Sequence, residues 1–225
     1  MQKKEHPGLP DFRVSVVELQ YFPSIPYFAL MAGSRKVLFE TQENFIKQTF
    51  RNRCRILTAN GVEDLVIPLR KPYQHIPITE IQIDNRQNWA GRHWKAIQSA
   101  YGKAPWFFQY KDTIMEMLES DKQLLAEFNL KIIDTCLKLL GMDVNTGFTD
   151  RYDKQLPDNF TDFRSLIHPK KKTTDLSWYK PIKYVQNFGP EFVPSLSVID
   201  LIFSEGPQAY NLLMNTLSTE NPKLN

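Results

Sequence analysis

The sequence has few cysteines and no long apolar run. Its two cysteines, Cys54 and Cys136, lie among apolar residues, where a thiol behaves as a small hydrophobic group, so no disulfide scaffold is expected. The N-terminal residues lack the apolar region of a signal peptide, and no window reaches the roughly 18 apolar residues that a membrane span needs. We therefore expect a cytoplasmic protein without membrane insertion.

Common catalytic and cofactor motifs are also missing. The sequence contains no G-x-G-x-x-G, no phosphate-binding Gly-rich loop, no G-x-S-x-G, no H-E-x-x-H and no C-x-x-C. The four histidines, at positions 6, 75, 93 and 168, do not have the spacing of zinc ligands. These absences exclude many enzyme classes, and the sequence predicts neither a cofactor nor a metal.

Neither sign of charge dominates the sequence. It has 28 Lys and Arg against 25 Asp and Glu, a net charge of +3, which is too small an excess to predict a nucleic-acid surface. A small anionic ligand needs only a local group of basic side chains. We expect such a ligand rather than a nucleic acid, and no pattern predicts the oligomeric state.

The chain is long enough to bury one sizeable core. Its 225 residues, of which 42% are hydrophobic, correspond to a single domain. Residues 1–11 include Pro7, Gly8 and Pro10 and predict a loose tail. Residues 12–225 predict one α/β domain.

The first part of the domain has the pattern of a β-α-β unit. A β-branched run at Val14–Leu19 predicts a strand, Ser24 can cap a short helix that ends at Gly33, and Lys36–Glu40 predicts a second strand. So short a connection through a helix favours parallel pairing. Glu18 and Glu40 would then lie at the carboxyl ends of neighbouring strands, where ligands of such sheets bind.

A hairpin and several helices follow. Phe50–Thr58 and Glu63–Leu69 read as two strands joined by the Asn60-Gly61 turn, and Ile78–Ile83 as another short strand. Residues 142–194 are rich in Pro and Gly and predict irregular structure. The fold class is thus α/β, a mixed sheet started by the β-α-β unit and the hairpin, followed by a mostly helical C-terminal half. Five helices are expected: Asn88 caps the first, which ends at Gly102, and Pro105 begins the second. Ser120 caps the third, with Gln123 as its capping-box partner, and this helix ends at Gly141. Ser195 caps the fourth, over residues 196–204, and Pro207 begins the fifth, which continues through residue 217.

Residues 40–55 contain the densest group of charged and amide side chains. If this stretch is extended from Phe50 onward, Arg51, Arg53 and Arg55 share one strand face, and guanidinium groups bind carboxylate or phosphate bidentately. The alternative is a solvated hairpin face with weak surface ion pairs. Spacing alone does not decide between the two.

Three further features each admit a functional and a structural interpretation. His93 lies on the apolar side of its helix and could be a general base or a buried histidine bonded to a carbonyl. Asp200 lies on the apolar side of its helix and needs a partner, for which a structural arginine is favoured over a substrate group. The run of lysines at 170–172 is typical of a solvated turn.

Four sequence blocks resemble the WbqC-like family, in the variant of Bacteroidetes-type bacteria. They cover about residues 13–217, and two departures from the wider family are Glu18-Leu19 and Glu40-Thr41. The blocks are Tyr21-Phe-Pro-Ser-Ile-Pro-Tyr-Phe28, Glu43 to Cys54 with Ala59-Asn-Gly61, Trp89 to Tyr101 around His93-Trp94, and Pro194 to Pro207 around Asp200.

The resemblance implies a function in the synthesis of bacterial surface polysaccharide such as O-antigen. It implies an enzyme that transfers an aminoacyl (glycine) or acyl group to an amino sugar held as an anionic sugar nucleotide. No covalent nucleophile is evident, so transfer would be direct. The alternative is a non-catalytic binding or accessory protein for the same anionic ligand.

The predicted site residues divide by role. Proton acceptors for an attacking amine are Glu40, Glu43 and His93. Groups that hold the ligand or donate to a developing oxyanion are Tyr21, Lys47, Gln48, Arg51, Asn52, Arg53 and Asp200.

Overall fold

The computed structural model describes residues 12–120 and 123–218, so the predicted tail at 1–11 lies outside the described residues. Strands β1 (Phe12–Glu18) and β2 (Ser34–Glu40) are joined by helix α1 (Ile25–Gly33) and pair in parallel. Their register sets Glu18 opposite Glu40. The predicted β-α-β unit is confirmed.

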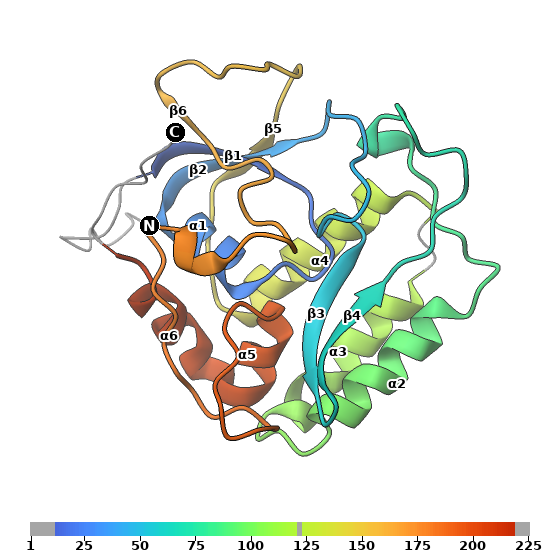
Figure 1. Ribbon diagram of the computed structural model, residues 1–225, viewed down its shortest axis with the longest axis vertical. Helices are drawn as coiled ribbons and strands as arrows, with labels where there is room; N and C mark the ends of the chain where they lie inside the picture. Colours follow the sequence, from blue (N-terminus) through green and yellow to red (C-terminus); the bar gives the residue numbers. More distant parts are fainter. Residues whose placement is uncertain (1–11, 121–122, 219–225) are drawn as a thin grey trace.

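Two short strands from the irregular region complete this sheet. They are β5 (Thr146–Phe148) beside β2 and β6 (Phe160–Asp162) beside β1, which gives the order β5-β2-β1-β6 with every pair parallel. The sheet lies at the top of Figure 1. Because all four carboxyl ends meet at one edge, Glu40, Glu18 and Asp162 end three adjacent strands.

The predicted hairpin forms a second sheet. Strand β3 (Arg53–Thr58) and strand β4 (Gly61–Val66) are antiparallel, and Gly61 has the positive φ of 99° that the tight turn requires. In Figure 1 the hairpin lies between α5 (Val198–Glu205) and the helices α2 (Trp89–Tyr101) and α3 (Phe107–Glu119). The strand begins at Arg53 rather than Phe50, and this shift changes the position of Arg51.

Three helices form the side of the molecule beyond the hairpin. Helix α2 (Trp89–Tyr101) begins after Asn88, whose side chain accepts from the N–H of Gly91, as predicted. Helices α3 (Phe107–Glu119) and α4 (Leu125–Leu139) follow. The mixed α/β fold with a mostly helical C-terminal half is therefore confirmed.

Several predicted boundaries are wrong. Residues 78–83 are not a strand: Ile78–Glu80 form a 3₁₀ turn (η1), because Ile78 and Ile81 are three residues apart and one turn buries both. Ser120 ends α3 instead of capping α4, and its Oγ donates to the carbonyl of Met117. The two residues between Ser120 and Gln123, the members of the predicted capping box, lie outside the described residues.

The C-terminal helices lie beside α1. Helix α5 (Val198–Glu205) is capped by Ser197, not Ser195, and ends at Gly206, where φ is 52°. A 3₁₀ turn η3 (Gly206–Gln208) leads into α6 (Ala209–Asn215), which begins two residues later and ends two residues earlier than predicted. A further 3₁₀ turn, η2 (Thr173–Asp175), precedes them.

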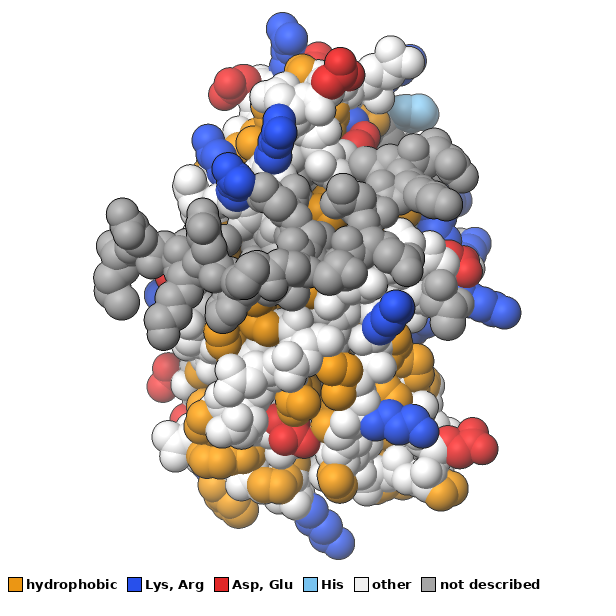
Figure 2. All heavy atoms as spheres, turned by 90° about the vertical axis from the view of Figure 1, so that its left-hand side faces the viewer, with side chains coloured by type: hydrophobic (Ala, Val, Ile, Leu, Met, Phe, Trp, Pro, Cys, Tyr) orange, Lys and Arg blue, Asp and Glu red, His pale blue; other side chains and the backbone are white. Residues whose placement is uncertain are grey.

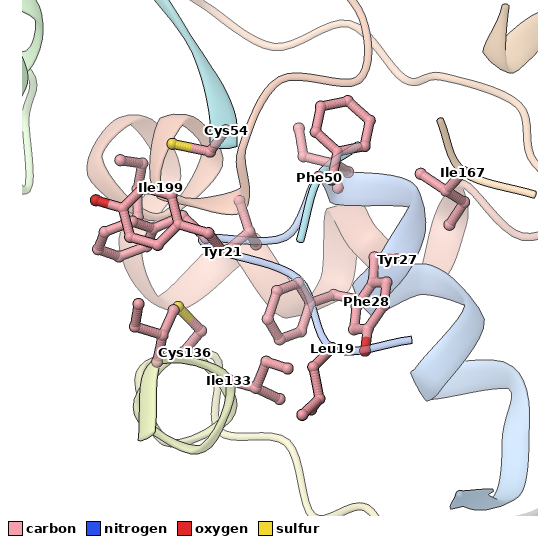
Figure 3. Packing of buried hydrophobic residues seen from close by; sticks show 14 of the residues in the cluster. Leu19, Tyr21, Tyr27, Phe28, Phe50, Cys54, Ile133, Cys136, Ile167 and Ile199 are labelled. Carbon is pink, nitrogen blue, oxygen red and sulfur yellow. The ribbon is translucent and has the colours of Figure 1, made fainter. Parts of the chain in front are cut away.

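The core is continuous between the two sheets and the helices. Residues 25–31 of α1 are all buried, as expected for a helix that is apolar on every side. Figure 3 shows the ring of Tyr21 between Cys54 of β3 and Cys136 of α4, and both cysteines are free and buried. They are core residues, as the sequence indicated.

The surface over α5 and α6 has no continuous basic area among its described residues. Figure 2 shows hydrophobic side chains gathered in the lower part of this view, and the Lys and Arg side chains in that part are spread singly. Within residues 12–120 and 123–218, no helix is long and apolar enough to cross a bilayer.

Candidate functional site

Of the carboxylates at the strand ends, those of Glu18 and Glu40 are buried and hydrogen-bonded, whereas that of Asp162 is partly exposed. Glu40, 0% exposed, accepts at Oε2 from Arg164 Nη1 at 3.0 Å, and at Oε1 from Thr149 Oγ1 at 2.8 Å and the N–H of Gln42 at 2.9 Å. A buried carboxylate needs such partners because burial removes its hydration. Arg164 also binds Asp162 at the end of β6, so one guanidinium joins two strand ends.

Glu18 is bound by neutral donors. Its Oε2 accepts from the backbone N–H of Ser165 at 2.8 Å and its Oε1 from Gln20 Nε2 at 2.8 Å. Ser165 has a φ of 56°, a backbone conformation that non-glycine residues rarely adopt. Glu18, at the end of β1, is therefore hydrogen-bonded to a strained residue that lies 147 positions further along the chain.

Arg51 and Glu43 form a buried bidentate ion pair. Arg51 Nε lies 2.7 Å from Glu43 Oε1, and Arg51 Nη2 lies 2.6 Å from Glu43 Oε2. Burial raises the pKa of Glu43 and Arg51 opposes the rise. Burial alone would lower the pKa of Arg51, but the carboxylates of Glu18 and Glu43 outweigh it and leave the pKa raised. Arg51 Nη1 has no partner among the described residues.

Residues 164–173, here called the strap, run from this ion cluster over the surface. Beyond Arg164 and Ser165, the carbonyl of Ile167 accepts from Gln20 Nε2 at 3.4 Å. Lys171 Nζ donates to the carbonyl of Ser165 at 3.1 Å, and Lys170 Nζ donates to Gln48 Oε1 at 3.2 Å. The strap is thus fixed to the ends of the strands through a series of polar contacts.

The other side of the strap forms a pocket of about 270 Å³. Among the described residues, no carboxylate lines it. The basic residues in its lining are Arg55, His168, Lys171 and Lys172. The hydroxyl-bearing residues are Ser24, Thr173 and Ser195, and the apolar residues are Phe50, Val62, Ile167, Val193, Pro194 and Leu196. This composition suits an organic anion, because basic groups bind the charge and apolar walls contact the rest.

Helix N-termini do not supply the pocket's donors. In α1 the N–H of Ile25 donates to the carbonyl of Leu196, and Pro26 has no N–H. In α5 the N–H of Val198 donates to the carbonyl of Pro23. An anion here would be bound by side chains rather than by the helix termini that often bind phosphate.

Comparison with known proteins identifies the family. The model of the WbqC-like protein family matches residues 20–168 and 164–212. This chain belongs to the WbqC-like family. It is also similar to Uncharacterized protein Rv1507c from Mycobacterium tuberculosis, with 24% identity over 227 residues, 89% of this chain and 97% of that protein. No solved structure matches.

In this WbqC-like protein the arginines of residues 40–55 do not share one face, so that prediction is wrong. Arg51 lies in the turn before β3 and points inward to Glu43. Arg53 and Arg55 pair with Asp64 on the facing strand, at 3.5 and 3.0 Å. The hairpin-face alternative, with ion pairs across the hairpin, therefore describes Arg53 and Arg55, of which Arg55 also lines the pocket. An internal ion pair describes Arg51.

The other residues predicted to bind ligand lie apart from the pocket. Lys47 and Gln48 are exposed, and Gln48 has a φ of 60°. Asn52 is buried and donates from Nδ2 to the carbonyl of Ile67 at 2.9 Å. None of the ten predicted site residues, all of which the structure describes, lines the pocket.

His93 lies in the aromatic core with Tyr21. Its Nδ1 is 2.8 Å from the hydroxyl of Tyr21, and Trp89 packs edge-on against its ring. Burial lowers the pKa of His93 to about 4, although a hydrogen bond with the backbone of Val66 opposes this. Burial also raises the pKa of Tyr21, so the phenol keeps its proton and donates to a neutral imidazole. These contacts correspond to the structural interpretation.

Asp200 is 1% exposed, and its partners are not arginines. Its Oδ2 accepts from the hydroxyl of Tyr184 and from Gln186 Nε2, the latter at 3.1 Å. Burial raises the pKa of Asp200, and Tyr184 opposes the rise. The prediction of an arginine partner is therefore wrong, because the preceding irregular segment supplies neutral donors.

The residues that line the pocket are not among those that the sequence pattern predicts as a site. Arg55 is a candidate for anion binding through the predicted arginine face, but it is not among the predicted site residues, and the spacing of His168 indicates only that it is no zinc ligand. The lysines at 170–172 were assigned to a solvated turn, yet Lys171 and Lys172 line the pocket with His168. A histidine two residues before three lysines was the available signal.

Proposed function

We propose that this WbqC-like protein binds an anionic sugar nucleotide in the pocket beside the strap and acts in bacterial surface-polysaccharide synthesis. The observation that carries the proposal is the pocket's charge: Arg55, His168, Lys171 and Lys172 line it and no carboxylate does. Guanidinium and ammonium groups recognise phosphate by charge-assisted hydrogen bonds.

The proposed reaction is direct transfer of an aminoacyl or acyl group from an activated ester or thioester donor to the amine of the sugar: the new C–N bond replaces the bond to the donor's alcohol or thiol, which leaves and takes up the proton that the amine loses. Family membership supports the pathway, and the cysteines support the absence of a covalent intermediate. Burial raises the pKa of both Cys54 and Cys136, so neither thiol forms a nucleophilic thiolate near neutral pH. The pocket would hold the phosphates and orient the amine.

A non-catalytic binding protein is the second candidate, and one observation favours it. Glu40 and Glu43, expected to accept the amine's proton, each hold a buried arginine, and the pKa of His93 is too low for a base at neutral pH. The oxygens of both carboxylates already accept hydrogen bonds from these arginines, and neither residue lines the pocket, so neither is placed to take the proton of an amine there. On this reading the three residues support the structure around the ligand.

Calorimetry with a panel of sugar nucleotides that carry amino sugars tests binding. Lys171→Ala with Lys172→Ala should weaken binding at least tenfold, because each lysine contributes charge to the pocket. Lys180→Ala with Lys183→Ala is the matched control, because both lysines are exposed and lie outside the pocket. Equal affinity in both double variants would overturn the proposal. Mass spectrometry of the sugar after incubation with acyl donors then separates the enzyme from the binding protein.

A further inference from the structure

His168 has one ring nitrogen committed to its own turn. Its Nδ1 accepts from the backbone N–H of Lys170 at 3.1 Å, and the carbonyl of His168 accepts from the N–H of Lys171 at 3.0 Å. A neutral imidazole has one donor and one acceptor nitrogen. With Nδ1 as the acceptor, the proton of the neutral ring is on Nε2, the nitrogen on the opposite side of the ring.

The charges around His168 oppose its protonation. Burial lowers its pKa, and Lys171, Lys170 and Arg51 lower it further, while Glu18 at the end of β1 opposes them. Arg55 of β3 and Lys172 add positive charge to the same pocket. The free protein near neutral pH therefore presents His168 as a neutral ring with a fixed tautomer.

We propose that His168 binds an oxyanion of the ligand through Nε2–H, with Lys171 and Lys172 supplying the opposite charge. This inference rests on the proposed function, because it assigns one donor within the same pocket. The oxyanion is a phosphate or sulfate-like group, whose oxygens accept several donors at once. His168 is then a ligand-binding donor rather than a general base, because neither nitrogen is free to accept a proton from substrate.

Binding an anion should reverse the electrostatic environment of His168. A negative charge near the ring favours the imidazolium, so the bound protein should have a higher His168 pKa than the free protein. By linkage, the affinity for the anion then rises as the pH falls through the interval between the two pKa values.

The test is a proton NMR titration of the histidine ring signals in the full-length protein. Sulfate is the probe, because it does not itself titrate near neutral pH, and chloride at matched ionic strength is the control. The signal of His168 is the one missing from the spectrum of His168→Gln. We expect sulfate, but not chloride, to raise its pKa by roughly 0.5–1 unit.

Two substitutions test the geometry. His168→Gln keeps an N–H donor near the position of Nε2, and His168→Asn keeps one near Nδ1. Sulfate affinity should stay within about threefold for Gln and fall about tenfold for Asn. Equal losses in both would overturn the inference. Because the titration uses the wild-type protein, it does not depend on how well the variants fold.

The outcomes separate this inference from the proposed function. If sulfate and the sugar nucleotides bind while the pKa of His168 stays unchanged, the inference fails and the proposed function stands. If neither sulfate nor any sugar nucleotide binds the wild-type protein, the proposed function fails, and the inference fails with it.

Discussion

At the scale of single residues, the buried ion pair of Arg51 and Glu43 should matter most for the stability of the fold. Arg51→Met would leave the carboxylate of Glu43 buried without its bidentate partner, and we expect a loss of about 3–5 kcal/mol in the free energy of unfolding. Urea denaturation followed by circular dichroism measures this. The double variant Arg51→Met with Glu43→Leu should lose less than Arg51→Met alone, because no unpaired charge remains. A larger loss in the double variant would contradict this account.

His93 should make stability depend on pH. Its folded-state pKa of about 4 lies below the ordinary value of 6.5, so the folded protein disfavours the imidazolium. The stability contribution of neutral His93 is therefore complete above pH 6.5 and is lost as the pH falls toward 4, by up to about 3 kcal/mol. Urea denaturation at a series of pH values should show this fall. His93→Gln should have a flatter profile over the same interval, and a parallel profile would exclude His93 as the cause.

The residue scale also shows what sequence patterns could not specify. That Asp200 needed a partner follows from its apolar helix face, but the identity of the partner depended on Tyr184 and Gln186, which come from a segment without periodicity. The alternation of side chains along a strand places Arg51 on the same face as Arg53 and Arg55 only if the strand begins at Phe50. Because β3 begins at Arg53, Arg51 lies in the preceding turn and its side chain points inward to Glu43.

At the scale of elements, the strap depends on Arg164. This guanidinium, 7% exposed, holds the strap to Glu40 and Asp162 at two strand ends. Arg164→Met should therefore leave residues 165–172 less protected, and their amide hydrogens should exchange at least tenfold faster in a mass-spectrometric experiment. Arg151→Met is the control, because Arg151 is 81% exposed and, within residues 12–120 and 123–218, its ion pair is with Asp153. Equal exchange in both variants would show that the strap is held in another way.

Elements with strong local signals were predicted well, and those that depend on distant contacts were not. Asn88 both caps and orients α2, and Gly61 sets the hairpin turn, so local chemistry determined both. By contrast, β5 and β6 are three residues each and become strands only beside β2 and β1. No local pattern distinguishes β5 from loop, and at 160–167 the pattern predicts a short strand or a helical turn without deciding between them.

At the scale of the molecule, the candidate site arises because distant segments meet at one sheet edge. The sequence predicted that Glu18 and Glu40 lie at neighbouring carboxyl ends, and the parallel register confirms this. It did not predict that the strap would cover them, because Glu18 and Ser165 are 147 residues apart. The basic pocket is a consequence of that return of the chain, which carries His168 and Lys171 to the surface beside Phe50 and Arg55.

A ligand in this pocket should stabilise the whole molecule. Because the strap joins the pocket to the strand ends, an anion that binds only the folded protein should raise its free energy of unfolding by about 2.7 kcal/mol at 100 times Kd. For a chain of this length that corresponds to roughly 5–10 °C in Tm. Differential scanning fluorimetry with the tightest-binding sugar nucleotide measures the shift. It should be largely lost with Lys171→Ala and Lys172→Ala and kept with Lys180→Ala and Lys183→Ala. An equal shift in both double variants would mean that the anion stabilises the protein from another place.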